Sequence, residues 1–118
     1  LVWKPWSHEA IAAAQAEGRP VLVDFTAKWC ATCNANKTFS IDIDATRDVL
    51  KELKYETLKA DNTLTPENIV REIQSFGRAG VPLVLLYSPD ANVKPTVMPA
   101  SFTPSMIQDA LKKAAGKK

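Results

Sequence analysis

Apolar and polar positions follow one another along this chain in blocks that predict strands and helices in turn. Two runs, Val21–Phe25 and Leu83–Tyr87, are almost wholly apolar, and such runs predict buried strands. A third strand is predicted over Tyr55–Ala60. Pro95–Met98 follows the turn-forming residues Ser88–Asn92, and we expect it to pair as an edge strand because prolines flank it.

The first two helices are predicted from capping residues and from the position of glycine. Ser7 is expected to cap a helix over residues 7–17, and Gly18 is well placed to end it. A second helix is expected over residues 30–38. Residues 39–43 are interpreted as a connection to the next helix.

Three later helices are predicted from buried stripes and from threonine–proline starts. Asp42 or Asp44 is expected to cap the first of them, and Thr65 and Thr103, each followed by proline, are expected to cap the other two. Their inward-facing stripes are Val49, Leu50 and Leu53; Ile69, Ile73 and Phe76; and Ile107, Ala110, Leu111 and Ala114.

Composition places the chain among ordinary globular domains. With 118 residues, 46% of them hydrophobic and 24% charged, it is expected to form a single domain over residues 1–118 with its own core. A net charge of +2 gives no basis for a nucleic-acid partner. No apolar stretch approaches the roughly 18 residues of a membrane span. A basic end is interpreted as favourable placement at a helix C-terminus; it comprises Lys112, Lys113, Lys117 and Lys118.

The aromatic residues near the start of the chain are interpreted as structural. We expect Trp3 and Trp6 to hold the first helix against the core. His8 is expected to be an exposed residue of the first helical turn, and no catalytic role is assigned to it.

The chemistry of the chain centres on its two cysteines, Cys30 and Cys33, which follow the strand Val21–Phe25 where a helix begins. A thiol at a helix N-terminus faces unpaired backbone N–H groups and the positive end of the helix dipole. Both favour the thiolate, which is the nucleophile in disulfide exchange. Cysteines three residues apart on this turn are close enough to bridge and re-open. The arrangement suits a two-electron dithiol/disulfide couple.

A zinc site, a structural disulfide and a pair of inert thiols are weaker interpretations of the two cysteines. A structural zinc site needs four ligands, whereas the chain offers two cysteines and the distant His8. A purely structural disulfide would close a very short loop, and loop-closure stabilisation shrinks with loop length. Two inert buried thiols are less favoured still.

The segment Val23–Trp29 followed by Cys30-x-x-Cys33 resembles the active-site segment of the thioredoxin superfamily, and Val81-Pro82 resembles that superfamily's cis-proline element. Further segments are similar to the C-terminal periplasmic domain of DsbD-type thiol:disulfide interchange proteins; they are 58–63, 76–83, 86–87, 97–99 and 102–104. The chain departs from these patterns at Ala31-Thr32, where thioredoxin has Gly-Pro, and at Lys28, where an acidic residue is common.

The resemblance implies an α/β, thioredoxin-like fold with a central mixed β-sheet flanked by helices on both faces, consistent with the predicted order of elements. It also implies a thiol:disulfide oxidoreductase, a protein-disulfide reductase without cofactor or metal. Such a domain would be periplasmic, tethered to the inner membrane and monomeric. It would pass electrons from a membrane-embedded cysteine pair of its parent protein to periplasmic thiol proteins. The alternatives are a free-standing thioredoxin-like enzyme and a non-redox protein-binding module that uses the Val81-Pro82 groove.

Roles in exchange can be assigned around the cysteines. Cys30, the more exposed thiol, is expected to attack the partner disulfide, and Cys33 to resolve the mixed disulfide. Asp24 is either a surface acid or, as we prefer, a buried acid with a raised pKa that relays a proton to or from Cys33. Lys28 is expected at the rim, either favouring the Cys30 thiolate or simply solvated.

The partner-binding groove is assigned to residues on both sides of the cysteines. Trp29 is interpreted as a wall beside the pair, although core packing would also account for it. Ala31 and Thr32 separate the two thiols. A cis bond before Pro82 would leave the Val81 backbone free to pair with an extended partner segment.

Overall fold

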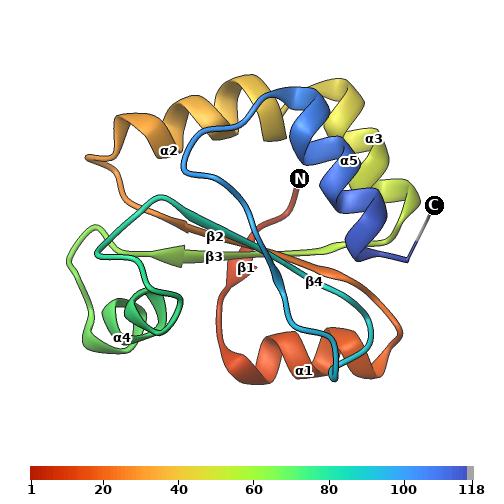
Figure 1. The fold of residues 1–118 in the computed structure, drawn as a ribbon, viewed down its shortest axis with the longest axis horizontal. Coiled ribbons are helices and arrows are strands. Elements are labelled where there is room, and N and C mark those ends of the chain that lie inside the picture. The colour runs from red at the N-terminus through yellow and green to blue at the C-terminus, as the bar shows by residue number, and fades with distance from the viewer. Residues whose placement is uncertain (117–118) are drawn as a thin grey trace.

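A five-stranded mixed sheet lies between two layers of helices in the computed structural model, which describes residues 1–116 (Figure 1). The predictions for Lys117 and Lys118 therefore lie outside the described residues. The strands are β1 (Lys4–Pro5), β2 (Val21–Thr26), β3 (Glu56–Asp61), β4 (Leu83–Tyr87) and β5 (Thr96–Val97). The helices are α1 (His8–Ala16), α2 (Ala31–Asn36), the π-helix η1 (Lys37–Ile41), α3 (Asp44–Glu52), α4 (Glu67–Ser75) and α5 (Pro104–Ala114).

The strands lie in the order β1-β3-β2-β4-β5. β1, β3 and β2 run parallel, whereas β4 and β5 are antiparallel to their neighbours. The predicted central mixed sheet is therefore confirmed, and β5 occupies the edge that the prolines indicated. No sequence pattern predicted β1, since a two-residue strand carries no periodicity. Backbone pairing with β3, in which Lys4 lies opposite Leu58, forms it.

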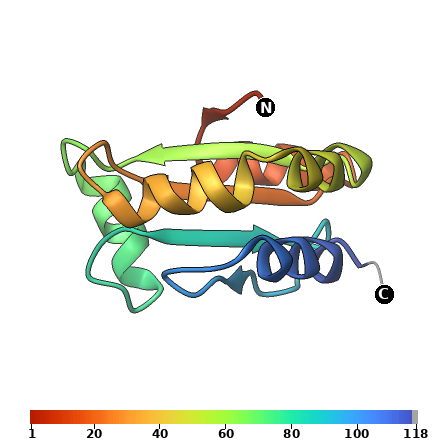
Figure 2. The ribbon, with the colours of Figure 1, turned by 90° about the horizontal axis from the view of Figure 1, so that it is seen from above.

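Each face of the sheet has its own hydrophobic core. α1 and α4 cover one face of the sheet, and α2, α3 and α5 cover the other, so the sheet lies between two helix layers in Figure 1. Figure 2, seen from above, shows the strands behind the layer that contains α2, α3 and α5. Residues of β2 alternate between the two cores: Val21, Val23 and Phe25 pack with α1 and α4, and Leu22 packs with α3 and α5. Because both faces are covered, all six residues of β2 are buried, as its apolar sequence predicted.

The two tryptophans near the start of the chain lie on opposite sides of the sheet. Trp6 packs against the core beside α1, as predicted, with its ring 5.5 Å from that of Phe25. Trp3 packs against the core on the other face, so its predicted contact with the first helix is wrong. Parallel pairing of the intervening β1 with β3 separates their positions. His8 is exposed, as predicted, and its Nε2 lies 3.0 Å from Glu72.

Local capping signals positioned two helices correctly. Ser7 accepts a hydrogen bond from the backbone N–H of Ala10, and Gly18 follows α1 with φ of 74°, a conformation that glycine adopts without steric cost. Thr103 caps α5 in the same manner by accepting from Met106, and Pro104 is its first residue.

Two other capping predictions are wrong. Neither Asp42 nor Asp44 caps α3, because Ile43 occupies the N-cap position and both carboxylates pair with Arg47 instead. Thr65 does not cap α4: its φ is 51°, outside the extended conformation of an N-cap, and Pro66 takes that position.

The segment predicted as a connection after the cysteine helix is largely helical. Residues 37–41 continue α2 as a π-helix, in which Ser40 and Ile41 are buried. The Ser40 hydroxyl donates to the carbonyl of Phe102 at 2.9 Å, and Thr46 donates to the carbonyl of Ser40. These contacts come from distant residues, so local periodicity did not reveal them.

Candidate functional site

Cys30 and Cys33 lie at the carboxyl end of β2, where the chain enters α2. Cys30 is the N-cap residue, and its sulfur accepts a hydrogen bond from the backbone N–H of Cys33 at 3.2 Å. The two residues form a disulfide, with their Cα atoms 5.3 Å apart. The buried strand sets the position of the pair, and the first turn of α2 sets its spacing. The predicted bridge across the first helical turn is present.

Little of the pair reaches solvent. Cys30 is 7% exposed and Cys33 is 3% exposed, and both pack with Ala27 and Val81 in a small apolar cluster. Cys30 is the more accessible of the two, in the order that the attacking and resolving roles require. Ala31 and Thr32, the residues between them, are exposed on the first turn of α2.

Asp24 is the buried acid of the site. It is 3% exposed in the middle of β2, so the surface alternative is excluded. Burial raises the pKa of Asp24 to about 6, and the positive charges of Lys37 and Lys59 oppose that rise. A carboxyl group with this pKa changes protonation near neutral pH, which suits the predicted proton relay.

Two lysines reach Asp24 from different elements. Lys59 lies opposite Asp24 in the parallel register of β2 and β3, so their side chains share one face of the sheet. Lys37 lies four residues after Cys33, at the spacing that places two side chains on the same side of a helix. Its ammonium is 5.2 Å from the centre of the Trp3 ring, within the range of a cation–π contact.

Trp29 and Lys28 stand exposed beside the pair, and the loop after β3 holds them. The Trp29 ring N–H donates to the carbonyl of Thr63 at 3.1 Å, and the Lys28 backbone N–H donates to the Thr63 hydroxyl at 2.9 Å. That hydroxyl in turn donates to Asp61. Trp29 is 60% exposed, so it borders the site rather than packing in the core.

The opposite border of the site is the Val81-Pro82 segment. The peptide bond between Val81 and Pro82 is cis, as the resemblance implied, and Val81 contacts the cysteine cluster. The Arg78 guanidinium holds this segment by donating to the carbonyls of Pro82 and Met98, each at 3.0 Å. The site therefore has Trp29 on one side and Val81 on the other.

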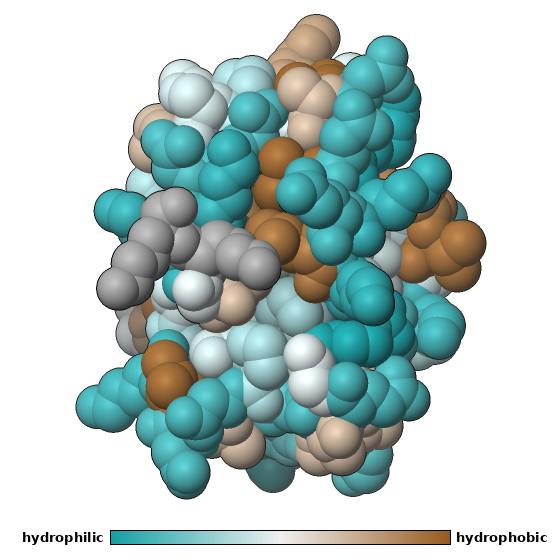
Figure 3. Space-filling model, turned by 90° about the vertical axis from the view of Figure 1, so that its right-hand side faces the viewer, coloured by the Kyte–Doolittle hydropathy of each residue, from teal (hydrophilic) through white to brown (hydrophobic). Residues whose placement is uncertain are grey.

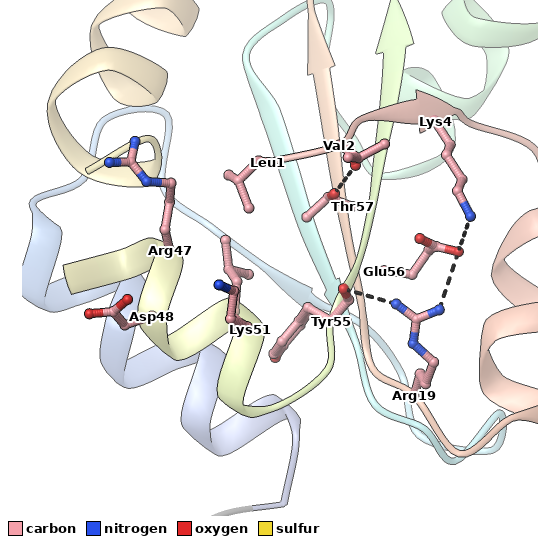
Figure 4. A pocket seen from close by; sticks show the side chains of 11 residues that line it. Leu1, Val2, Lys4, Arg19, Arg47, Asp48, Lys51, Tyr55, Glu56 and Thr57 are labelled. Carbon is pink, nitrogen blue, oxygen red and sulfur yellow. Dashed lines mark hydrogen bonds and ion pairs between the residues drawn. The ribbon is translucent and has the colours of Figure 1, made fainter. Parts of the chain in front are cut away.

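A cavity of about 730 Å³ lies elsewhere, against the amino ends of β2 and β3 (Figure 4). There Arg19 donates to the carbonyl of Tyr55 and pairs with Glu56, which Lys4 also approaches. The cysteines lie at the carboxyl end of β2, so this cavity is separate from their site. The same end of the molecule is mostly hydrophilic, with apolar residues in small patches (Figure 3).

The described residues offer neither a metal site nor a membrane span. Within residues 1–116, no three His, Cys, Asp or Glu side chains form a group that could hold a metal ion. No helix in that range is both long and apolar enough to cross a bilayer.

Sequence reasoning missed several residues that shape the site. Lys37 and Lys59 act on Asp24, Thr63 holds the Trp29 loop, and Arg78 holds the cis-proline segment. Asn36 is buried one turn after Cys33, where it donates to Ala100 and accepts from Phe102. The four-residue spacing from Cys33 was a usable signal for Lys37. The others depend on contacts between distant segments.

Comparisons with known proteins agree with this geometry. A family model described as thioredoxin-like matches residues 2–89. The thiol:disulfide interchange protein DsbD of Ralstonia nicotianae is 30% identical over 87 residues, which is 74% of this chain and 14% of that protein. DsbD of Salmonella typhi is 26% identical over 91 residues, covering 77% of this chain and 16% of that protein. The chain thus spans only 14–16% of the length of these relatives.

Solved structures share the fold. The C-terminal domain of Neisseria meningitidis DsbD in the oxidised form has a TM-score of 0.74 at 14% identity, covering 96% of this chain and 99% of that one. A thioredoxin from Thermus thermophilus has a TM-score of 0.77 at 23% identity, covering 96% and 85%. At these identities the likeness concerns the fold alone, and it confirms the predicted architecture.

Proposed function

This chain belongs to the thioredoxin-like family, and on that premise we propose that it is a thiol:disulfide oxidoreductase that reduces protein disulfides. The observation that carries the proposal is the Cys30–Cys33 disulfide at the start of α2, within a fold that also buries Asp24. A structural role for this bridge is disfavoured, since a loop this short contributes little to stability.

In the proposed reaction the reduced pair acts first through Cys30. Its thiolate attacks one sulfur of the partner disulfide, a mixed disulfide forms, and the other partner sulfur leaves as a thiolate that takes a proton from water. Cys33 then loses its proton and attacks the Cys30 sulfur, which releases the second partner thiolate. Two electrons pass to the partner, and Cys30 and Cys33 end as a disulfide.

Asp24 is proposed to accept the proton that Cys33 loses. With a pKa of about 6, the carboxyl group is largely ionised at pH 7 and remains basic enough to accept a proton. Protonation also removes a buried charge, so the transfer is favoured by the same burial that raised the pKa of Asp24. Lys28 is exposed beside the pair and is proposed to favour the Cys30 thiolate modestly.

The partner is proposed to bind between Trp29 and Val81. An extended segment would pair with the Val81 backbone before Pro82, in the manner of an added strand, and lie across Ala31 and Thr32. Such pairing uses main-chain groups, so it tolerates many partner sequences.

The finer assignment is that the chain is a single periplasmic domain of a longer, membrane-tethered DsbD-like protein. A membrane-embedded cysteine pair of the same parent would reduce Cys30–Cys33, and the chain would pass the electrons to a periplasmic thiol protein. The sequence identity of 30% and 26% between this chain and two DsbD proteins supports this assignment. A monomeric state is part of the proposal.

The test is equilibration of the pair in glutathione buffers of known ratio, read by mass spectrometry after thiol trapping. A reversible change between disulfide and dithiol at Cys30 and Cys33 is expected, together with catalysed reduction of a peptide disulfide. A pair that stays oxidised across all the buffers would overturn the proposal. If the double variant Cys30→Ala/Cys33→Ala still supported the biological activity of the protein, a non-redox binding module would be favoured instead.

A further inference from the structure

Three lysines from separate elements meet beside the cysteines. Lys28 follows β2, Lys37 opens the π-helix and Lys59 lies in β3, and all three line one small cavity of about 60 Å³. Lys28 is exposed, and the other two are half-buried. The fold therefore brings three lysines to one cavity next to the segment that carries the cysteines, and the Lys37 ammonium there also lies 5.2 Å from the centre of the Trp3 ring. We refer to the three residues as the lysine cluster.

Within residues 1–116, no ion pair neutralises the lysine cluster, whereas four other cations are paired. Lys4, Arg19, Arg47 and Arg71 each lie within 4.0 Å of a carboxylate oxygen. Among the described residues, no carboxylate oxygen comes that close to the ammonium of Lys28, Lys37 or Lys59.

One exposed carboxylate, Asp61, also lines the cavity. Asp61 accepts two hydrogen bonds from Thr63, which occupy one of its oxygens. The buried Asp24 bears on the charge as well, since its carboxyl group is protonated in part of the population near neutral pH. Three cations thus face at most two carboxylates, and the border keeps a positive excess.

The surroundings of the lysine cluster fit a protein segment better than a free ion. Trp29 is 60% exposed, its ring N–H donates to the carbonyl of Thr63, and the next residue in the chain, Leu64, is 89% exposed. On the far side of the cysteines, the Arg78 guanidinium donates to two backbone carbonyls. These carbonyls are uncharged, so they do not neutralise the positive charge of Arg78. A partner would meet apolar surface with positive charge on both sides.

We propose that this surface selects partner segments that carry acidic residues next to their disulfide, with the partner's carboxylates placed against Lys28, Lys37 and Lys59. The inference rests on the proposed disulfide exchange and adds a preference among its substrates. Charge complementarity of this kind raises the association rate and weakens as salt screens it.

The experiment uses two synthetic peptides of equal length, each closed by the same disulfide. Three glutamates flank the disulfide in one peptide, and three lysines flank it in the other. The reduced protein is mixed with each, and the second-order rate of reduction is measured at low and high ionic strength. The acidic peptide should react roughly tenfold faster at low salt, since each exposed charge pair contributes a factor of about 1.4 to 5. The ratio should fall toward one in 1 M salt.

Single substitutions place the preference on the lysine cluster. Lys28→Gln should lower the acidic-to-basic rate ratio by about twofold or more, and Lys37→Gln and Lys59→Gln should act in the same direction. Lys51→Gln, an exposed position on α3, is the matched control: it removes the same charge and should leave the ratio unchanged. Any effect of Lys37 or Lys59 through Asp24 alters both rates alike and cancels in the ratio.

The outcomes separate this inference from the proposed function. Reduction of both peptides at equal rates, or an equal loss of preference in Lys51→Gln and Lys28→Gln, would overturn the lysine cluster as a docking surface while the redox activity stands. Failure to reduce either peptide would instead overturn the proposed function.

Discussion

Asp24 and Lys59 lie opposite each other on the parallel strands β2 and β3, on the sheet face that α2 covers. The ammonium lowers the pKa of the carboxyl group, but desolvation is the larger effect and leaves that pKa raised to about 6. Lys59 therefore offsets only part of the free-energy cost of burying the ionised Asp24 carboxylate. A group in this balance connects the stability of the fold with the chemistry of Cys33.

The first prediction concerns the pH dependence of stability. Between about pH 4, the pKa of an unfolded aspartate, and pH 6, the folded state holds a proton that the unfolded state has lost. The free energy of unfolding should therefore fall as the pH rises through this window and level off above it. The expected fall due to Asp24 is about 3 kcal/mol, from roughly 1.4 kcal/mol for each pKa unit.

Asp24→Asn tests this directly, because the amide has no proton to lose. The variant should lack this part of the pH dependence. Its free energy of unfolding should therefore fall less than that of the parent between pH 4 and pH 8. Urea unfolding of the oxidised protein at both pH values measures it. The same substitution should slow exchange near neutral pH, since Cys33 loses its proton acceptor. If the two proteins had the same pH dependence of unfolding free energy and the same pH–rate profile for exchange, both expectations would be contradicted.

The second prediction separates the two cysteines. Cys33→Ala should accumulate a mixed disulfide with a peptide or protein partner, because Cys30 still attacks and nothing resolves the product. Cys30→Ala should trap little, since Cys33 is the more buried thiol. Non-reducing electrophoresis and mass spectrometry measure the adduct. Equal trapping by both variants would show that the roles are wrongly assigned.

The third prediction concerns Trp29 as a border of the partner site. Because its side chain is 60% exposed and makes one hydrogen bond, Trp29→Ala should lower the free energy of unfolding by no more than about 1 kcal/mol. The rate of reduction of a protein disulfide should nevertheless fall several-fold. Phe39→Ala is the control, since Phe39 is 69% exposed and lies farther along the helix. A similar loss of rate in both variants would argue against a specific contact at Trp29.

The fourth prediction concerns the buried amide behind the cysteine helix. Asn36 donates to the carbonyl of Ala100 at 2.9 Å and accepts from the N–H of Phe102, so Asn36→Ala leaves both backbone groups without this partner. The expected loss is about 1–3 kcal/mol in the free energy of unfolding. Asn34→Ala, at an exposed position two residues away, should change it by less than about 0.5 kcal/mol. Chemical unfolding of the two variants measures both changes. Equal losses of unfolding free energy would show that the buried hydrogen bonds of Asn36 do not account for the effect.

Local sequence signals accounted for much of the scaffold. The apolar runs at Val21 and Leu83 located two buried strands, and the threonine–proline pair at Thr103 located the start of α5. The same kind of signal failed at Thr65, where the backbone adopts φ of 51° and the cap moves to Pro66. A capping residue marks the start of a helix only when its own backbone is extended. The sequence alone does not give that backbone conformation.

What the sequence determined by itself is the redox pair and its setting: two cysteines three residues apart, after a buried strand and at the start of a helix. These features are local, since an apolar run and a helix cap each involve only a few neighbouring residues. The tertiary structure decided what surrounds the pair. Burial of Asp24 under α2, the approach of Lys37 and Lys59, and the hold of Thr63 on Trp29 all join residues distant along the chain. Desolvation and Coulomb interactions depend on distance in space, so the protonation chemistry of this site arises only once the chain has folded.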